Sequence, residues 1–204
     1  MSTRPMTIAA LESHLRAERK NLRWLTETTE LAIASYRASS AEYARSWLPV
    51  LRRSYETWPF EAIPASTCSE LELVTEIFEF ARSFSLHVDH NTAWRDALSA
   101  NSPILSKVAT ISIRGQTDGD ELVRELSSSP HLSNLRHLHL VKNNISTAGI
   151  LQIAKTGAFH GITSLKLDGN TLGDHGLAAL TNSTHLKDLT RLSCWQCEVG
   201  EGGV

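Results

Sequence analysis

The sequence predicts an α/β protein built as a solenoid, a stack of coils with parallel strands on one face and helices on the other, preceded by an α-helical N-terminal region. Three columns of mainly aliphatic residues recur every 27 residues from Val108 onward. Within each repeat, the first half alternates like a strand and the second half has helical spacing. The columns are Ile111, Leu138, Leu165 and Leu192; Val108, Leu135, Ile162 and Leu189; and Ile113, Leu140, Leu167 and Cys194.

The first half of each repeat predicts a short strand followed by a bend. Residues two apart lie on one face of a strand, so Leu138 and Leu140 point into the core while the neighbouring histidines point outward. Asn143 stands where the chain bends away, and Asn170 takes the same place one repeat later. Because the bend leaves backbone amides without strand partners, we expect these asparagines to hydrogen-bond the backbone of neighbouring coils.

The second half of each repeat predicts a helix that returns the chain to the next strand. The segments that begin at Gly149 and Gly176 have helical spacing, and Ile153 and Leu180 are again 27 residues apart. The glycine allows the start of the helix to approach its neighbour closely. One coil cannot bury its leucines alone, so neighbouring coils must share a continuous core.

The pattern resembles a known repeat family. Leu135–Ile145 and Ile162–Leu172 both follow L-x-x-L-x-L-x-x-N/C-x-L, the pattern of leucine-rich repeats. A period of 27 residues with a helical second half is similar to the ribonuclease-inhibitor-like class, and Ser129–Leu138 looks like bacterial members of that group. The resemblance is strong over Leu135–Leu180 and looser over Val108–Leu126. It implies parallel strands on a concave face and helices on a convex face.

The last repeat has a predicted strand but no helix, because Gly203 aligns with Gly149 and Gly176 near the end of the sequence. A solenoid needs a polar cap at its ends. We therefore expect that the chain is a fragment of a longer array, with self-association through the uncapped C-terminal coil as the alternative.

The N-terminal region is predicted to be helical. Apolar residues at three- and four-residue spacing predict a helix over Thr7–Ala34 that packs against the next helix, or alternatively forms a coiled coil with a second chain. Ser39 and Glu42 form a capping box that opens a second helix. Pro49 lies inside it, so either the helix kinks there or a new helix starts.

The predicted linker is Trp58–Pro64, which breaks the helical pattern. It separates the α-helical N-terminal region, residues 1–65, from the repeat solenoid, residues 70–204, which we expect to be incomplete at its C-terminus.

The segment Glu70–Val88 is compatible with a helix or a hairpin. We favour a strand for its second part, because Phe84 and Leu86 lie one 27-residue period before two members of the aliphatic columns. Phe84–Val88 would then be the strand of the first coil, and Asn91–Leu98 its helix, with Asn91 as the cap.

Composition argues for an ordinary globular protein. Of the 204 residues, 41% are hydrophobic and 21% are charged, which is typical of that class. A net charge of −2 argues against a nucleic-acid binder. There is no apolar run long enough to cross a membrane and no apolar core of a signal peptide. We expect a cytoplasmic protein without nucleic-acid or membrane partners.

The repeat also explains the side chains that could carry chemistry. Cys194 and Cys197 form C-x-x-C, but Cys194 takes a buried leucine position and Cys197 the asparagine position. A redox pair or half a zinc site is the alternative. His87 and His90 lack a third metal ligand at recognisable spacing. Since no catalytic motif is present, we expect no enzyme, no cofactor and no metal.

The outward residues of the strands form the candidate partner-binding face. Relatives of this class commonly bind proteins there, and tryptophan and arginine are frequent in interface hot spots. The alternative is that these are only solvated strand residues. The two histidines would make binding pH-sensitive near their ordinary pKa of about 6.5. The candidates are Thr110, His137, Ser164 and Arg191; Ser112, His139, Lys166 and Ser193; and Arg114, Val141, Asp168 and Trp195.

These observations favour a non-enzymatic protein–protein interaction module whose partner the sequence does not identify. The alternative is a regulator of an enzyme on the same scaffold, either GTPase-activating-like or an inhibitor of a hydrolase. Some proteins of similar repeat type activate GTPases through a residue outside the repeats.

Overall fold

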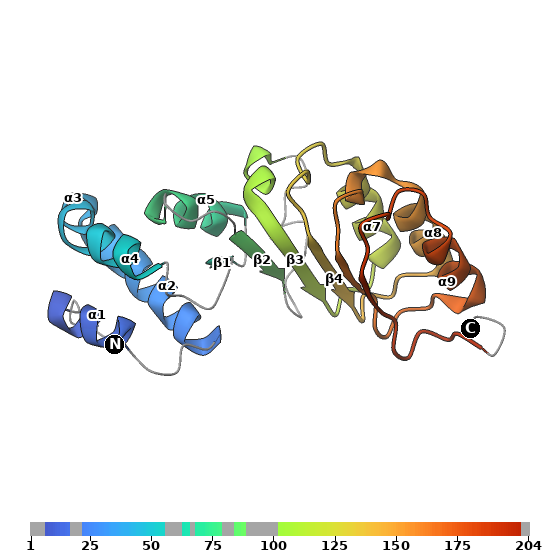
Figure 1. The fold of residues 1–204 in the computed structure, drawn as a ribbon, viewed down its shortest axis with the longest axis horizontal. Coiled ribbons are helices and arrows are strands. Elements are labelled where there is room, and N and C mark those ends of the chain that lie inside the picture. Colours follow the sequence, from blue (N-terminus) through green and yellow to red (C-terminus); the bar gives the residue numbers. More distant parts are fainter. Residues whose placement is uncertain are drawn as a thin grey trace. The chain divides into compact units, whose positions relative to one another are not determined.

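The chain is a mixed α/β protein that divides into two compact units. The computed structural model describes residues 7–16, 22–55, 63–65, 68–78, 84–88 and 102–200. The first unit comprises Met1–Ala65 and Ser69–Phe84, and the second comprises Ser66–Cys68 and Ser85–Val204. In Figure 1 the colours run from the blue helices of the first unit to the orange and red segments of the second.

The first unit opens with two helices, so the prediction of a single helix over Thr7–Ala34 is wrong. Helix α1 spans Ile8–Leu15 and ends at Arg16, whereas α2 spans Leu22–Ala38. The apolar stripe continues through both helices, since each helix contributes buried residues to it. These buried residues include Leu11, Leu15, Leu25 and Ala32.

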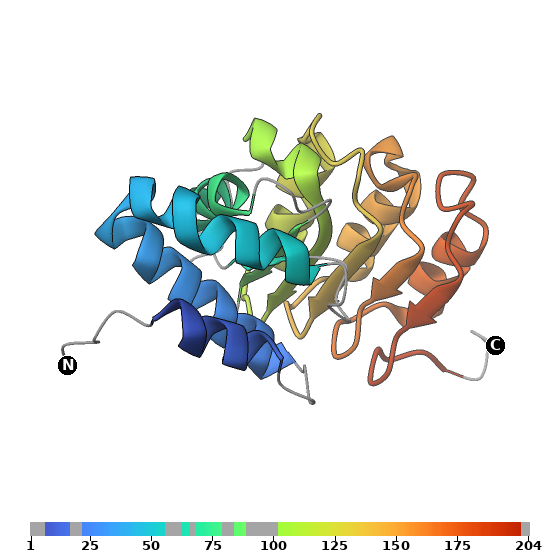
Figure 2. The ribbon, with the colours of Figure 1, turned by 60° about the vertical axis from the view of Figure 1, so that its left-hand side comes forward.

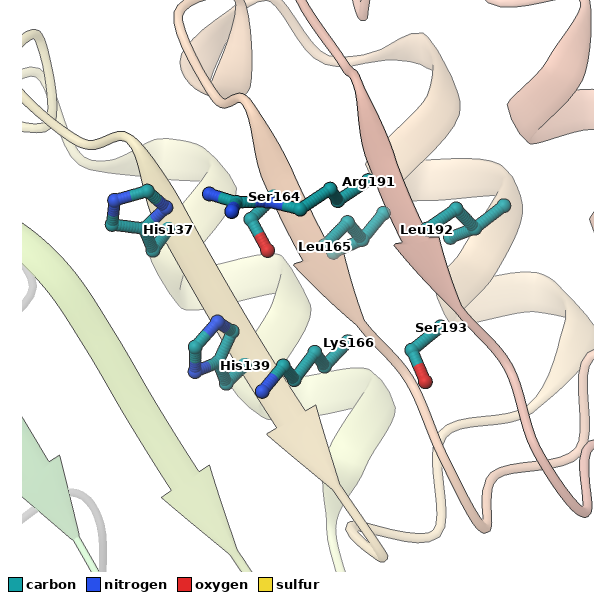
Figure 3. A pocket seen from close by; sticks show the side chains of 8 residues that line it. All are labelled: His137, His139, Ser164, Leu165, Lys166, Arg191, Leu192 and Ser193. Atoms are coloured by element: carbon teal, nitrogen blue, oxygen red, sulfur yellow. The ribbon is translucent and has the colours of Figure 1, made fainter.

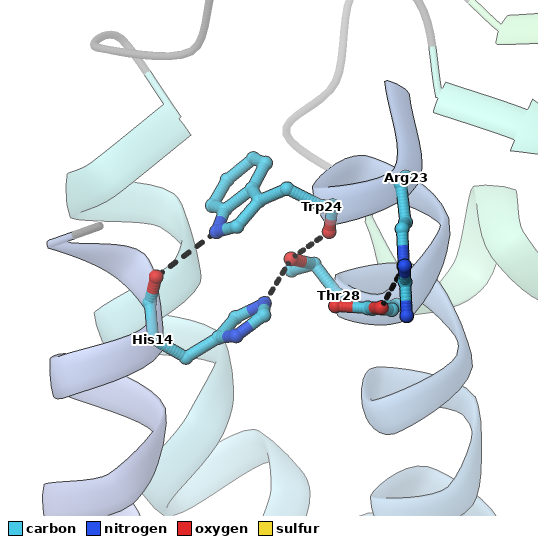
Figure 4. Close-up of polar contacts among 5 residues, drawn as sticks. His14, Arg23, Trp24 and Thr28 are labelled. Atoms are coloured by element: carbon cyan, nitrogen blue, oxygen red, sulfur yellow. Dashed lines mark hydrogen bonds and ion pairs between the residues drawn. The ribbon is translucent and has the colours of Figure 1, made fainter. Parts of the chain in front are cut away.

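Side chains from α2 hold the end of α1 (Figure 4). The Trp24 indole N–H donates to the carbonyl of His14 at 2.9 Å, and the two rings stack with centroids 5.6 Å apart. The His14 ring also hydrogen-bonds the Thr28 hydroxyl at 2.8 Å. The carbonyl of His14 thus gains a partner at the last turn of α1, where helical partners run out.

The next helical stretch runs through Pro49 without a break, since a π turn precedes the proline. It consists of α3 (Ser40–Glu42), the π-helical segment Tyr43–Trp47 and α4 (Leu48–Tyr55). The Ser39 hydroxyl accepts from the Glu42 amide at 3.3 Å, which confirms Ser39 as the cap. The other half of the capping box is not found, because the Ser39 amide donates to the Ser35 carbonyl at 3.1 Å. Proline cannot donate to the carbonyl four residues earlier, and a π turn accommodates such a gap in the ladder.

The rest of the first unit contains β1 (Ile63–Ala65) and α5 (Cys68–Ile77), and β2 (Phe84–Val88) follows. For the segment Glu70–Val88, a helix is therefore found in the first part and the predicted strand in the second part. Most of the linker Trp58–Pro64, the helix Asn91–Leu98 and Gly203 lie outside the described residues.

In the second unit, the strands follow one another in chain order across a sheet. Strands β3 (Val108–Arg114), β4 (His137–Val141), β5 (Ser164–Lys166) and β6 (Arg191–Ser193) are paired in parallel. Leu165 pairs with Leu138 on one side and with Leu192 on the other. Residues one period apart therefore lie directly opposite each other, as the spacing predicts.

The helices of this unit form a second layer on one side of the sheet (Figures 1 and 2). Helix α8 packs against both α7 and α9. The core lies between the two layers, where the inward leucines and isoleucines of β3, β4 and β5 are buried. The segments are α7 (Gly119–Ser128), α8 (Thr147–Lys155) and α9 (Gly173–Thr181), with 3-10 turns at Pro103–Lys107 and Gly157–Phe159.

Buried asparagines join one repeat to the next, as predicted. The Asn170 side-chain oxygen accepts from the backbone amides of Asn143 and Ile145, both at 3.0 Å. Its nitrogen donates to the carbonyls of Leu140 at 2.6 Å and Leu167 at 2.7 Å. One amide group therefore satisfies four backbone groups, three of which belong to the preceding repeat.

Asn143 and Cys197 occupy equivalent places in the neighbouring repeats. The Asn143 side chain accepts from the Gln116 amide at 3.0 Å and donates to the Ile113 carbonyl at 2.8 Å. The Cys197 thiol donates to the Leu167 carbonyl at 3.1 Å. A thiol has one weak donor, so it replaces only part of the amide's bonding.

A second regularity was not predicted. The residue just before the bend has a positive φ in four successive repeats: 75° at Gly115, 54° at Lys142, 70° at Gly169 and 53° at Gln196. Only two of these are glycine, although this backbone region is costly for residues with a Cβ. The positive φ at this position is therefore imposed by the geometry of the repeat and not only by the conformational preference of the residue that occupies it.

The expectation that Cys194 is buried is wrong, because the residue is half-buried. Leu192 is half-buried as well. Leu192 lies in β6, and Cys194 directly follows it. Because β6 is the last strand in the order of the sheet, the described residues provide it with a neighbouring strand on one side only.

No helix in the described part of the chain is long and apolar enough to cross a membrane.

We predict that Asn170→Ala lowers the free energy of unfolding by about 2–4 kcal/mol, because it leaves buried amides and carbonyls without partners. Asn182→Ala is the control, since this exposed side chain makes one bond, to the Ala178 carbonyl at 2.8 Å; it should cost less than about 0.5 kcal/mol. Urea unfolding would measure both. Equal losses would contradict a special role of the buried amide.

We predict that Gly149→Ala destabilises the protein by about 1–3 kcal/mol, because the new methyl group has no room. A Cβ there would lie 2.3 Å from the Asp120 carboxylate and 2.7 Å from the Ile145 side chain. Gly157→Ala is the matched control, with nothing within 4 Å of its Cβ. Thermal unfolding of the two variants should differ clearly; similar transition temperatures would argue against the close approach of the repeats.

Candidate functional site

A groove of about 450 Å³ lies on the face of the sheet that carries no helices (Figure 3). We call it the strand groove. Six of its eight lining residues belong to the twelve that the repeat predicts for the partner-binding face. The lining residues are His137, His139, Ser164, Leu165, Lys166, Arg191, Leu192 and Ser193.

The parallel register explains why these side chains meet. His137, Ser164 and Arg191 are paired in one row across three strands. A second row, two residues further along each strand, contains His139, Lys166 and Ser193. Since side chains two apart share a face, both rows point away from the buried leucines between them.

The other candidates lie around the groove. Thr110 and Ser112 on β3 pair with the two histidines of β4, and Arg114 pairs with Val141. These four residues belong to the same sheet face without lining the groove. Sequence periodicity therefore placed them on the correct face, while the extent of the groove was not predictable from it.

Ser164 lies on the outward side of the strand as predicted, but it is only 5% exposed, which the sequence did not indicate. Its neighbours in the row are the larger His137 and Arg191, and Figure 3 shows the Arg191 side chain extending across it. Ser164 is thus the floor of the groove. Periodicity gives the direction of a side chain and says nothing about what its neighbours cover.

Asp168, another predicted member of the strand face, uses one of its carboxylate oxygens for hydrogen bonds within the protein. One of its oxygens accepts from the Ser193 hydroxyl at 2.6 Å and from the Trp195 amide at 2.7 Å. Both residues belong to the following repeat, so Asp168 ties successive repeats together. The bond also fixes the backbone of Trp195, whose side chain is 71% exposed.

The groove is cationic, because Lys166 and Arg191 line it and no carboxylate does. Lys166 and Arg191 are exposed, and within the described residues neither has a carboxylate as an ion-pair partner. Arg114, at the edge of the same face, is also exposed. The single carboxylate predicted among the candidates is occupied by its own hydrogen bonds.

The electrostatic environment changes the behaviour of His139. Burial and then the positive charge of Lys166, with smaller contributions from His137, His87 and Arg191, lower the pKa of His139 to about 4. The rings of His137 and His139 are 6.4 Å apart. His139 is therefore neutral near pH 7, and the expectation that it titrates near 6.5 is wrong.

Cys197 and His87, two further candidates for chemistry, make hydrogen bonds within the protein. Cys197 is buried, and this burial raises the pKa of its thiol, which disfavours the reactive thiolate. His87 hydrogen-bonds Ser85 at 3.1 Å, and His90 lies outside the described residues. Within the described ranges, no three His, Cys, Asp or Glu side chains are grouped so that they could hold a metal ion.

No family model matches the chain, and no curated protein is similar to it. Assignment of a class of protein therefore depends on the 27-residue period and on the geometry described above.

We predict that NMR titration gives His139 a pKa of about 4. Lys166→Gln should raise this pKa by removing a nearby positive charge. Because the pKa is lower in the folded than in the unfolded state, His139 destabilises the fold as pH falls from about 6.5 towards 4. His139→Gln, which also assigns the resonance, should make this loss smaller. A pKa of 6 or above would contradict the described burial.

Proposed function

We propose that the second unit is a leucine-rich repeat solenoid of the ribonuclease-inhibitor-like class and that the protein is a non-enzymatic module that binds a protein partner through its concave strand face. Three findings support the class: the constant period, the pairing of residues one period apart, and the asparagines that bond the preceding repeat. The bacterial type and the cytoplasmic location stay predictions.

The observation that carries this proposal is the convergence of three strands on one groove. Six predicted outward residues line it, and they come from β4, β5 and β6. Concave sites of this kind are where ligands bind most often.

Trp195 is the best candidate for a hydrophobic anchor. It is the one large hydrophobic residue in the described ranges that is strongly exposed, and its backbone is held by Asp168. Tryptophan is over-represented among the residues that contribute most to binding at protein interfaces. Arg191, which lines the groove, is the second residue of a type that is frequent in interface hot spots.

A regulator of an enzyme, GTPase-activating-like or inhibitory, would use the same face and remains the alternative. GTP turnover by candidate small GTPases, with and without the protein, would separate the two. Stimulation of turnover would replace the proposal by the alternative.

We predict that the double variant Val141→Glu, Trp195→Ala loses a partner that wild type recovers in affinity purification, since it adds a charge and removes the anchor on the strand face. The double variant Ala148→Glu, His175→Ala makes matched changes at exposed positions of α8 and α9. It should retain the partner.

The expected loss in affinity is at least roughly tenfold, as for truncation of an interface hot spot. Quantitative mass spectrometry of the recovered proteins measures it. Partners that are recovered equally by both double variants would argue against the strand face.

A further inference from the structure

We propose that the strand groove binds carboxylate side chains of an acidic segment of the partner protein, held by Lys166 and Arg191 above the hydroxyl of Ser164. This inference depends on the proposed function, because it specifies the chemistry of the partner at the same face.

The first argument is the floor of the groove. Ser164 is 95% buried and lines the groove, and its hydroxyl has no hydrogen-bond partner within the described residues. It is not among the hydroxyls sealed from solvent, so it opens into the groove. A hydroxyl that opens into the groove and has no partner within the protein is free to donate to a ligand oxygen there.

The second argument is the arrangement of the two cations. Lys166 and Arg191 come from neighbouring strands, and Figure 3 shows both side chains reaching towards β4. The arginine passes over Ser164 towards His137, and the lysine ends beside His139. Guanidinium and ammonium groups on either side of a hydroxyl donor match a carboxylate, which accepts from several donors at once.

The third argument is that the protein itself does not neutralise these charges. Asp168, the nearest carboxylate in sequence to Lys166, accepts from Ser193 and Trp195. No other carboxylate in the described part of the chain pairs with either cation. An acidic ligand would thus meet two unpaired positive charges in a partly enclosed site, where their attraction is stronger than in open water.

The fourth argument distinguishes a carboxylate from a nucleic-acid backbone. Nucleic-acid binding requires a run of phosphate contacts from a basic surface. The groove provides two cations, the chain has a net charge of −2, and neutral His139 adds no charge. Isolated carboxylates on a peptide fit this limited charge.

Binding has a specific spectroscopic consequence. Lys166 and Arg191 help to keep His139 unprotonated. A carboxylate between these cations would offset their field, so the pKa of His139 should rise when the groove is filled. A peptide that binds elsewhere on the surface would leave the pKa of His139 unchanged.

The test uses the full chain and a fluorescent polyglutamate peptide at low ionic strength, with anisotropy as the readout. Wild type should bind it saturably, and Lys166→Gln, Arg191→Gln should weaken binding roughly tenfold or more. The control variant Lys155→Gln, Lys187→Gln also removes two positive charges, but from exposed positions on a helix and a turn outside the groove. This control should bind within about twofold of wild type.

Ser164→Ala separates the groove from general charge attraction, because it changes no charge. It should weaken binding by several-fold, and circular dichroism should show an unchanged fold. The upward shift of the His139 pKa should accompany peptide binding in wild type and disappear in Lys166→Gln, Arg191→Gln.

Three results would overturn this inference. The first is equal weakening by the groove and control variants; the second is an unchanged His139 pKa at saturation. The third is preference for a phosphoserine peptide or inorganic phosphate over polyglutamate. If polyglutamate does not bind but Val141→Glu, Trp195→Ala still loses its partner, the acidic ligand is wrong and the proposed function stands.

Discussion

The structure of the second unit depends on the hydrogen bonds that buried asparagines make to the preceding repeat. Each bend leaves amides and carbonyls that no strand can satisfy, and they are buried where water cannot reach them. Asn170 satisfies four such groups, and Asn143 repeats this role one period earlier. An amide is suited to the position because it combines an acceptor with two donors.

This constraint also produces the strand groove. With neighbouring repeats held in one register, residues one period apart form rows across the sheet, and the inward leucines fix which residues point outward. Each row therefore brings side chains from three repeats next to one another on the strand face. Asp168 adds a second link between repeats and does not line the groove. The cationic character of the groove comes from Lys166 and Arg191, which the register brings onto neighbouring strands.

Sequence periodicity was sufficient for the strands, the pairing partners and the asparagine bonds, because all three follow from a regular spacing of buried and bonded residues. It failed where a feature depends on neighbours in space. The burial of Ser164, the internal bonds of Asp168 and the low pKa of His139 each arise from side chains on adjacent strands. In the first unit, a continuous apolar stripe concealed the break after Arg16, since two packed helices can share one stripe.

The most direct test of the central claim is an NMR measurement of contacts between successive repeats. If asparagine bonds lock the repeats in register, methyl groups of Leu165 should show cross-relaxation with Leu138 and Leu192, and the amides of Asn143 and Ile145 should exchange slowly with solvent. Contacts at a different offset, or rapid exchange of these two amides in the folded protein, would contradict the account.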